Sequence, residues 1–219
     1  MKKALFIVSI FIFSINVSFC QTIQGSYDDT LRLQSALSPS TEIFNLESKP
    51  TFAKMFGKSF LNVCTYNIVI SGSLLLMPES ISKWDANTKL NLHHIANQYR
   101  LTYTKPPIMD CDLWVVNYFG HPCQGSFYYN SVRSQGATIF QSALASTLHT
   151  LIWEYGWEGG MEQPSVQDLL VTPIFGSLLG EFSHQATLKM KKNGFRWYEK
   201  IITCIVNPNY VLNNGLNSK

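Results

Sequence analysis

A few charged side chains inside an otherwise apolar stretch constrain the fold of this chain more than any other feature. Between Asp110 and Glu181 the chain consists mainly of small, aromatic and aliphatic residues. A charge buried among apolar helices destabilises the fold strongly unless it is paired, so these charges must meet one another or meet water. The stretch therefore predicts a polar cluster inside a helical bundle. The charged residues that define the cluster are His121, Arg133, Glu154, Glu158, Asp168 and Glu181.

Helical spacing within the stretch supports this interpretation. His121 shares one helix face with positions 125, 128 and 132, which follow it at offsets of 4, 7 and 11 residues. Tyr129 and Arg133 form a neighbouring pair on the same helix. Glu154 and Glu158 lie four residues apart on the next helix and stack on one of its faces.

The sequence predicts an all-α protein that consists of a single bundle of about six helices and is rich in small residues. Ser165 with Asp168 resembles a capping box that starts a short helix. Thr172 and Pro173 then suit the N-cap and first position of a separate helix, and Gly136 suits a C-terminal cap. The segments expected are a helix over 52–77, a turn or short helix over 79–87, an amphipathic helix over 88–101, an extended connector to 110, helices over 121–136 and 137–158, the two helices from 165 and 172, and a last helix over 195–206.

The first long helix allows two interpretations. The 20 residues from 59 to 78 carry no charge, which is enough to cross a bilayer. Asn62 and Asn67 lie among several hydroxyl side chains there, and such residues make a poor lipid-facing span. We therefore favour a buried central helix for this segment.

The N-terminus predicts export. Lys2 and Lys3 precede an apolar run that ends at Ser18 and Cys20, which is the pattern of a signal peptide over residues 1–20, cleaved before Gln21. An uncleaved anchor and an acylated Cys20 are the alternatives. Residues 21–50 form a polar leader or arm, residues 51–210 the helical domain and residues 211–219 a polar tail.

Composition limits the partners. Removal of the two lysines lowers the net charge from +3 to +1, so the mature chain lacks the excess of basic residues that is typical of nucleic-acid-binding proteins. Charged residues make up 14% of the chain and hydrophobic residues 46%, and a soluble domain needs more charge than this to cover its surface. We expect a membrane surface or an envelope protein as the partner.

Cysteines and sequence motifs identify no cofactor. Four cysteines remain after cleavage, and in an exported chain we expect one disulfide, with Cys111 and Cys123 close in sequence. CxxC and HxxxH spacings are absent from the sequence, so we assign no metal ligand from it. The cofactor is left open, since phosphate-loop, dinucleotide and GxSxG motifs are absent too.

Two hypotheses cover the charged cluster. In the first it is a structural network, in which Arg133 neutralises a glutamate, His121 bonds a backbone carbonyl, Asp168 caps a helix and Glu181 pairs with His184 or a lysine. In the second it is an acid–base site, because paired carboxylates shift one another's pKa. Carboxylates on facing helices can also hold a divalent ion. The catalytic candidates are His121, Glu154, Glu158 and Asp168, and the ligand-binding candidates are Asn117, Tyr129, Arg133 and Glu181.

The order of motifs resembles a known bacterial family. The patterns are D-x-D-x-W from Asp110, H-P-x-x-G-x-x-Y-Y from His121, R-x-x-G, W-E-x-x-x-E, P-S-x-x-D, T-P-x-x-G and G-E. Over roughly residues 55–210 they resemble the family called domain of unknown function 3943, found in exported proteins of Gram-negative bacteria. A fainter likeness is to VanZ-like membrane proteins, although Thr172 stands where their pattern has asparagine.

The resemblance implies an exported, envelope-associated helical domain, and it does not indicate a reaction. We therefore expect a protein of the periplasm or outer membrane that lies against a membrane and has a structural or interaction role. The alternative is an envelope hydrolase that acts on lipid or another envelope substrate, with His121 as base and a glutamate as its partner.

Overall fold

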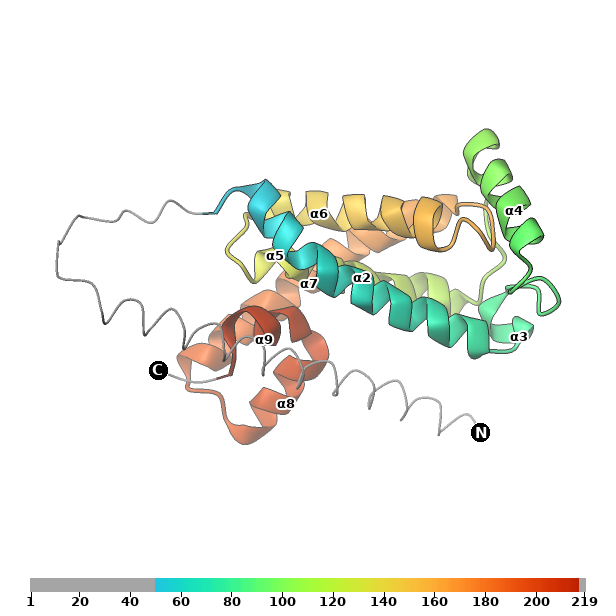
Figure 1. Ribbon diagram of the computed structural model, residues 1–219. Coiled ribbons are helices and arrows are strands. Elements are labelled where there is room, and N and C mark those ends of the chain that lie inside the picture. Colours follow the sequence, from blue (N-terminus) through green and yellow to red (C-terminus); the bar gives the residue numbers. More distant parts are fainter. Residues whose placement is uncertain (1–49, 217–219) are drawn as a thin grey trace, which may run out of the picture. The chain divides into compact units, whose positions relative to one another are not determined.

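The computed structural model describes residues 50–216, and over this range the protein is all-α, as predicted (Figure 1). Strands are absent from this range, where an isolated parallel bridge joins Ile108 to Ser165. The expected signal peptide, Cys20 and the polar leader up to residue 49 lie outside the described residues.

The first described helix, α2 (Phe52–Leu76), begins and ends where the sequence predicts. Thr51 caps it by accepting a hydrogen bond from the Lys54 amide, and Pro78 follows its end. The expectation that it is a buried central helix is wrong. Only 17% of its most apolar 18-residue window is buried, and its length and composition would allow it to cross a membrane. Two of its polar residues, Ser59 and Asn67, are buried, while the apolar Leu61 and Leu76 are exposed.

Three helices build the centre of the fold: α5 (His121–Arg133), α6 (Ile139–Ile152) and α7 (Val166–Lys192). Helix α5 packs against both others and against α2 (Figure 1). At the α5–α7 crossing the two backbones touch, since a Cβ built on Gly176 would lie 2.5 Å from the Gly125 Cα. Glycines allow this approach, so the small residues predicted to permit close packing have that role here.

Helix α7 corrects the expectation of two helices in this region. It runs without interruption from Ser165, whose hydroxyl accepts the Asp168 amide, and contains Pro173 in its interior. Proline removes one backbone donor, and here this loss is tolerated within 27 residues of helix. Thr172 is therefore no N-cap.

Two π-helical turns adjoin these helices. The first, η1 (Val116–Gly120), leads directly into α5, and the second, η2 (Trp153–Trp157), continues α6. The Glu158 amide donates to the Trp153 carbonyl, five residues back, at 2.9 Å. Such turns occur often at functional sites and were not predicted here.

Shorter helices complete the described chain: α3 (Glu79–Ser82), α4 (Leu92–Thr104), α8 (Trp197–Val206) and α9 (Pro208–Asn214). Helix α9 extends beyond residue 210 into the expected polar tail, because Asn207 caps it and Tyr210 and Val211 are buried. The expected disulfide is also absent. Cys111 and Cys123 are exposed free thiols on either side of η1, and the other described cysteines are free as well.

The described part of the protein is polar inside and apolar outside. Hydroxyl and amide side chains fill much of the interior, among them Ser142, Ser146 and Asn130, all at most 1% exposed. Large apolar side chains face outward instead, including Phe140 at 77% and Phe182 at 74% exposure. A protein surrounded by water normally shows the opposite arrangement.

Candidate functional site

Three buried side chains from three elements meet in one cluster. His121 is the first residue of α5, Glu154 lies in η2, and Asp168 lies in the first turn of α7. The His121 Nε2 atom is 3.4 Å from the Asp168 Oδ1 atom. One nitrogen or oxygen of each of the three residues lies within 4.8 Å of the other two. None of the three is more than 6% exposed.

Hydrogen bonds to their second polar atom orient the His121 and Glu154 side chains. The Thr172 hydroxyl lies 3.1 Å from the His121 Nδ1 atom, so the ring presents Nε2 to the cluster. The Ser165 amide donates to Glu154 Oε2 at 2.9 Å. The remaining oxygens, Glu154 Oε1 and Asp168 Oδ1, make no hydrogen bond to the described chain. Buried carboxylate oxygens are normally satisfied, so these two stand out.

Asp110 extends the cluster from an extended segment of the chain. Backbone hydrogen bonds between Ile108 and the residues on each side of Ser165 hold that segment against the start of α7. The Asp110 carboxylate accepts hydrogen bonds from the Ser165 hydroxyl and, at 2.7 Å, from the Asn117 side chain. Asn117, a predicted ligand-binding candidate, therefore orients an acid at the edge of the cluster.

Further carboxylates surround this centre on its more exposed side. Glu158 accepts a hydrogen bond from the Trp153 indole at 2.5 Å, and Glu162 accepts one from the Trp84 indole at 2.8 Å. Both are partly exposed, as are Asp110 and Asp112. Within residues 50–216 no lysine or arginine forms a salt bridge with any of these acids.

Burial is the main cause of the pKa shifts in the cluster, and the neighbouring acids add to it for the carboxyls. Burial, reinforced by Asp168, raises the pKa of Glu154 to about 8. Burial, reinforced by Asp110, raises the pKa of Asp168 to about 8. Burial holds the pKa of Glu158 well above its ordinary value. It also lowers the pKa of His121 to about 4, so the imidazole stays neutral. The buried carboxylates therefore need a proton or a cation to neutralise them.

Arg133 does not join the cluster, although we expected it to converge with His121. It lies twelve residues further along α5, about 18 Å along the helix axis. There its guanidinium binds both oxygens of Glu181, at 2.8 and 3.0 Å. The Tyr129 hydroxyl donates to the same carboxylate at 2.6 Å. Arg133, Tyr129 and Glu181 thus form a separate, neutralised group between α5 and α7.

The structural-network hypothesis is therefore correct in one part and wrong in others. Arg133 does neutralise a glutamate, which is Glu181. Glu181 accordingly pairs with neither His184 nor a lysine. His121 contacts the Thr172 hydroxyl where a backbone carbonyl was expected, because Thr172 lies inside α7 beside the ring.

Several members of the cluster were not predicted as site residues. Asp110 was noticed only as a motif position and Ser165 only as a helix cap, and the D-x-D pattern was the signal that could have identified Asp110. Glu162 falls between the expected helices over 137–158 and from 165, and nothing in its local sequence marks its contact with Trp84, 78 residues away.

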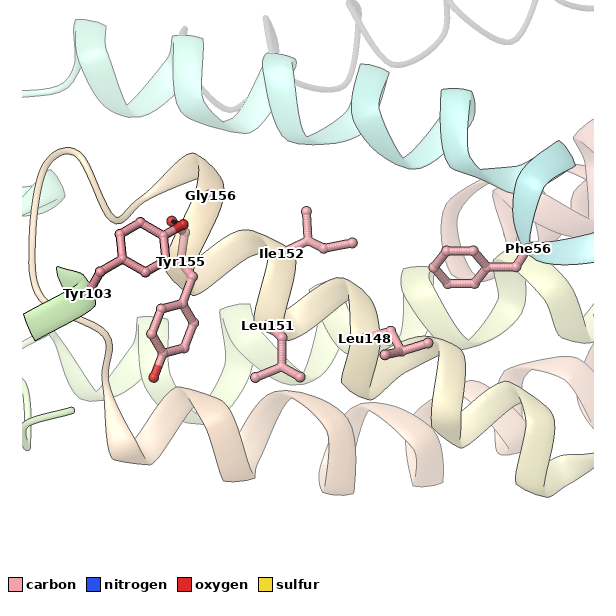
Figure 2. Close-up of a pocket in the computed structure, with 7 residues that line it drawn as sticks. All are labelled: Phe56, Tyr103, Leu148, Leu151, Ile152, Tyr155 and Gly156. Carbon is pink, nitrogen blue, oxygen red and sulfur yellow. Dashed lines mark hydrogen bonds between the residues drawn. The ribbon is translucent and has the colours of Figure 1, made fainter. Parts of the chain in front are cut away.

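An apolar groove of about 510 Å³ lies elsewhere, along α6 and η2 (Figure 2). Figure 2 shows Phe56 from α2 at one end and Tyr103 from α4 at the other. The groove contains none of the cluster's acids or His121, so we locate the candidate site by the polar cluster. The lining residues are Phe56, Tyr103, Leu148, Leu151, Ile152, Tyr155 and Gly156.

Comparison with known proteins supports the family resemblance alone. The chain has no significant match among curated proteins or solved structures. The likeness to VanZ-like membrane proteins stays a prediction. Residues 106–209 match the model of a family described as Domain of unknown function (DUF3943), a range that includes α5, α6, α7 and the whole His121–Glu154–Asp168 cluster. The predicted resemblance to domain of unknown function 3943 is thus confirmed for residues 106–209.

Proposed function

We propose that the His121–Glu154–Asp168 cluster is the active centre of an exported cell-envelope protein, and that it hydrolyses a lipid or another envelope substrate. The observation that carries this proposal is a group of buried carboxylates with no lysine or arginine to neutralise them in the described part of the chain. Such an arrangement costs stability, and proteins keep costly polar clusters mainly where they act.

The second group of charges provides an internal comparison. The Arg133 and Glu181 side chains neutralise each other through two hydrogen bonds, as expected of a pair with a structural role. The carboxylates near His121 have no such partner. A purely structural or interaction role accounts for the first group and leaves the second without a reason.

The arrangement suits activation of water. Ligand atoms of His121, Glu154 and Asp168 lie within 4.8 Å of one another, so a water molecule held between them would be polarised and would pass a proton to a deprotonated carboxylate of Glu154 or Asp168. The partly exposed acids Asp110 and Glu158 lie on the side from which a substrate would approach.

The apolar exterior supports contact with a lipid bilayer as part of this proposal. Helix α2 has 25 residues and is about 37 Å long at about 1.5 Å per residue, against a bilayer core of about 30 Å. With small and polar residues inside and large apolar ones outside, the bundle is suited to a lipid environment. We expect the protein in a washed membrane fraction and in need of detergent for extraction; a chain that stays monodisperse without detergent would refute this part.

Melting temperature and hydrolysis together test the active centre. Glu154→Gln removes the titratable carboxyl but keeps an oxygen that can accept the Ser165 amide, so we expect an unchanged or higher melting temperature and loss of ester hydrolysis in lipid micelles. Arg133→Gln is the comparison, because breaking a neutralised pair should lower the melting temperature. If Glu154→Gln lowers it as much as Arg133→Gln does, the cluster is structural.

A further inference from the structure

The two free carboxylate oxygens in the cluster point to a missing partner. Glu154 is 2% and Asp168 4% exposed, yet Glu154 Oε1 and Asp168 Oδ1 have no hydrogen-bond donor among the described residues. Asp168 Oδ1 lies 3.4 Å from His121 Nε2, a nitrogen that can offer a lone pair, and one carboxylate oxygen of Glu154 lies within 4.8 Å of a ligand atom on each of these two residues. With its proton on Nδ1, neutral His121 offers a lone pair at Nε2, and one imidazole nitrogen beside two carboxylate oxygens suits a cation.

We propose that His121 Nε2, Glu154 Oε1 and Asp168 Oδ1 bind one divalent metal ion. This inference rests on the proposed function, since it names the cofactor of the same site. Two carboxylates balance the charge of a divalent ion, which accounts for the lack of a lysine or arginine salt bridge to these acids in residues 50–216.

The distances suit such an ion. Ligands about 2.1 Å from a tetrahedral metal lie about 3.4 Å from each other. The His121 Nε2 and Asp168 Oδ1 atoms are already 3.4 Å apart, and the three ligand atoms lie within 4.8 Å of one another.

The surrounding hydrogen bonds also suit a metal site. Ligands of protein-bound metals are usually oriented by bonds to their other polar atoms. Here the Thr172 hydroxyl contacts His121 Nδ1, and the Ser165 amide donates to the second oxygen of Glu154. Each bond leaves the metal-facing atom free.

The donor set indicates which ions to test. One imidazole and two carboxylates suit Zn²⁺ or Mn²⁺, and Cys₄-type structural sites are excluded because the cluster contains no thiol. Three protein ligands leave a position for water, whose pKa a bound metal lowers towards neutrality.

Metal content of the full mature chain tests the inference. The chain is purified in detergent, stripped with a chelator, equilibrated with Zn²⁺ or Mn²⁺ and analysed for bound metal. Cys111 and Cys123 are changed to serine throughout, because exposed thiols bind zinc nonspecifically. We expect about one equivalent per chain and a higher melting temperature with metal.

Variants of the ligand residues test whether the metal is bound at this cluster. Asp168→Asn and His121→Ala should each lose at least about nine tenths of the bound metal, since each removes one of three ligands. Asp85→Asn, which changes an exposed aspartate outside the cluster, should keep the full equivalent. Less than stoichiometric metal in the parent chain, or equal metal in all variants, overturns the inference.

Hydrolysis measured on the same samples separates this inference from the proposed function. Activity that survives chelation but is lost in Glu154→Gln would overturn the metal site and keep the acid–base centre. Stoichiometric metal without hydrolysis of any ester tested would support the metal site and overturn the hydrolase.

Discussion

The contact between α5 and α7 gives the sharpest prediction for stability, through Gly125→Ala. A Cβ built on Gly125 would lie 1.9 Å from the Thr172 carbonyl oxygen and 2.8 Å from its carbon. Both atoms belong to the backbone, so no side-chain rotation can relieve the clash. The two helices must move apart by more than 1 Å to restore a normal contact of about 3.3 Å.

The magnitude follows from two opposing terms. Overpacking a tight core costs about 1–3 kcal/mol, and a clash with backbone belongs at the upper end. Alanine in place of glycine returns about 1 kcal/mol of helix propensity. Separation of the helices also weakens the contact between His121 of α5 and Thr172 of α7. We expect a net loss of about 2 kcal/mol, a fall in melting temperature of about 4–8 °C for a chain of this size.

Thermal unfolding in detergent, followed by circular dichroism, measures this loss. Gly57→Ala is the matched control, because Gly57 lies in α2 and a Cβ there meets no heavy atom within 4 Å. That variant should gain about 0.5–1 kcal/mol. The reasoning is refuted if Gly125→Ala melts at or above the parent temperature, because the two helices would then not touch at this glycine.

Three further predictions concern contacts outside the cluster. Hydrogen bonds from Arg133 lower the pKa of Glu181 to about 2, so its contribution to stability is full above pH 4.5 and is lost as the pH falls towards 2. Glu181→Gln should remove up to about 3 kcal/mol of unfolding free energy near neutral pH, and stability should then depend less on pH between 4.5 and 2. An unchanged pH dependence in this range would contradict the prediction. The Lys89 ammonium donates to two carbonyls at the end of α2 and to the Ser82 hydroxyl, so Lys89→Met should lower the urea midpoint by the equivalent of about 1–3 kcal/mol. An unaltered midpoint would show that these bonds contribute nothing to stability. Thr138→Ala should cost about 1 kcal/mol in thermal unfolding, because its hydroxyl caps α6, whereas Thr138→Ser should not.

Much of the helical fold could be predicted from local sequence. The expected helix over 52–77 agrees with α2 to within a residue, and the predicted all-α class is confirmed for the described residues. Local rules failed for α7, where Thr172 and Pro173 look like a helix start. The Thr172 hydroxyl bonds His121 across the bundle, and this long-range contact outweighs its capping preference.

The candidate site was only partly predictable, for a related reason. The rule that buried charges must meet brought His121, Glu154 and Asp168 together, and the structure does so too. The same rule does not identify the partner of each charged residue. Arg133 was therefore grouped with the cluster, although it lies at the other end of α5 and pairs with Glu181. Asp110 was missed because its place depends on pairing between Ile108 and the start of α7.

The two π turns give the site a particular sensitivity to chain length. In η1 and η2 the hydrogen bonds span five residues, one more than in an α-helix, and His121 and Glu154 lie at or within these turns. A deletion of one residue from η2 would let it relax into ordinary helix, turning the residues on one side by about 100° against the other. Glu154 would then face away from His121 while α6 and α7 could still pack. Loss of a single codon could thus convert this bundle into a folded protein without its site.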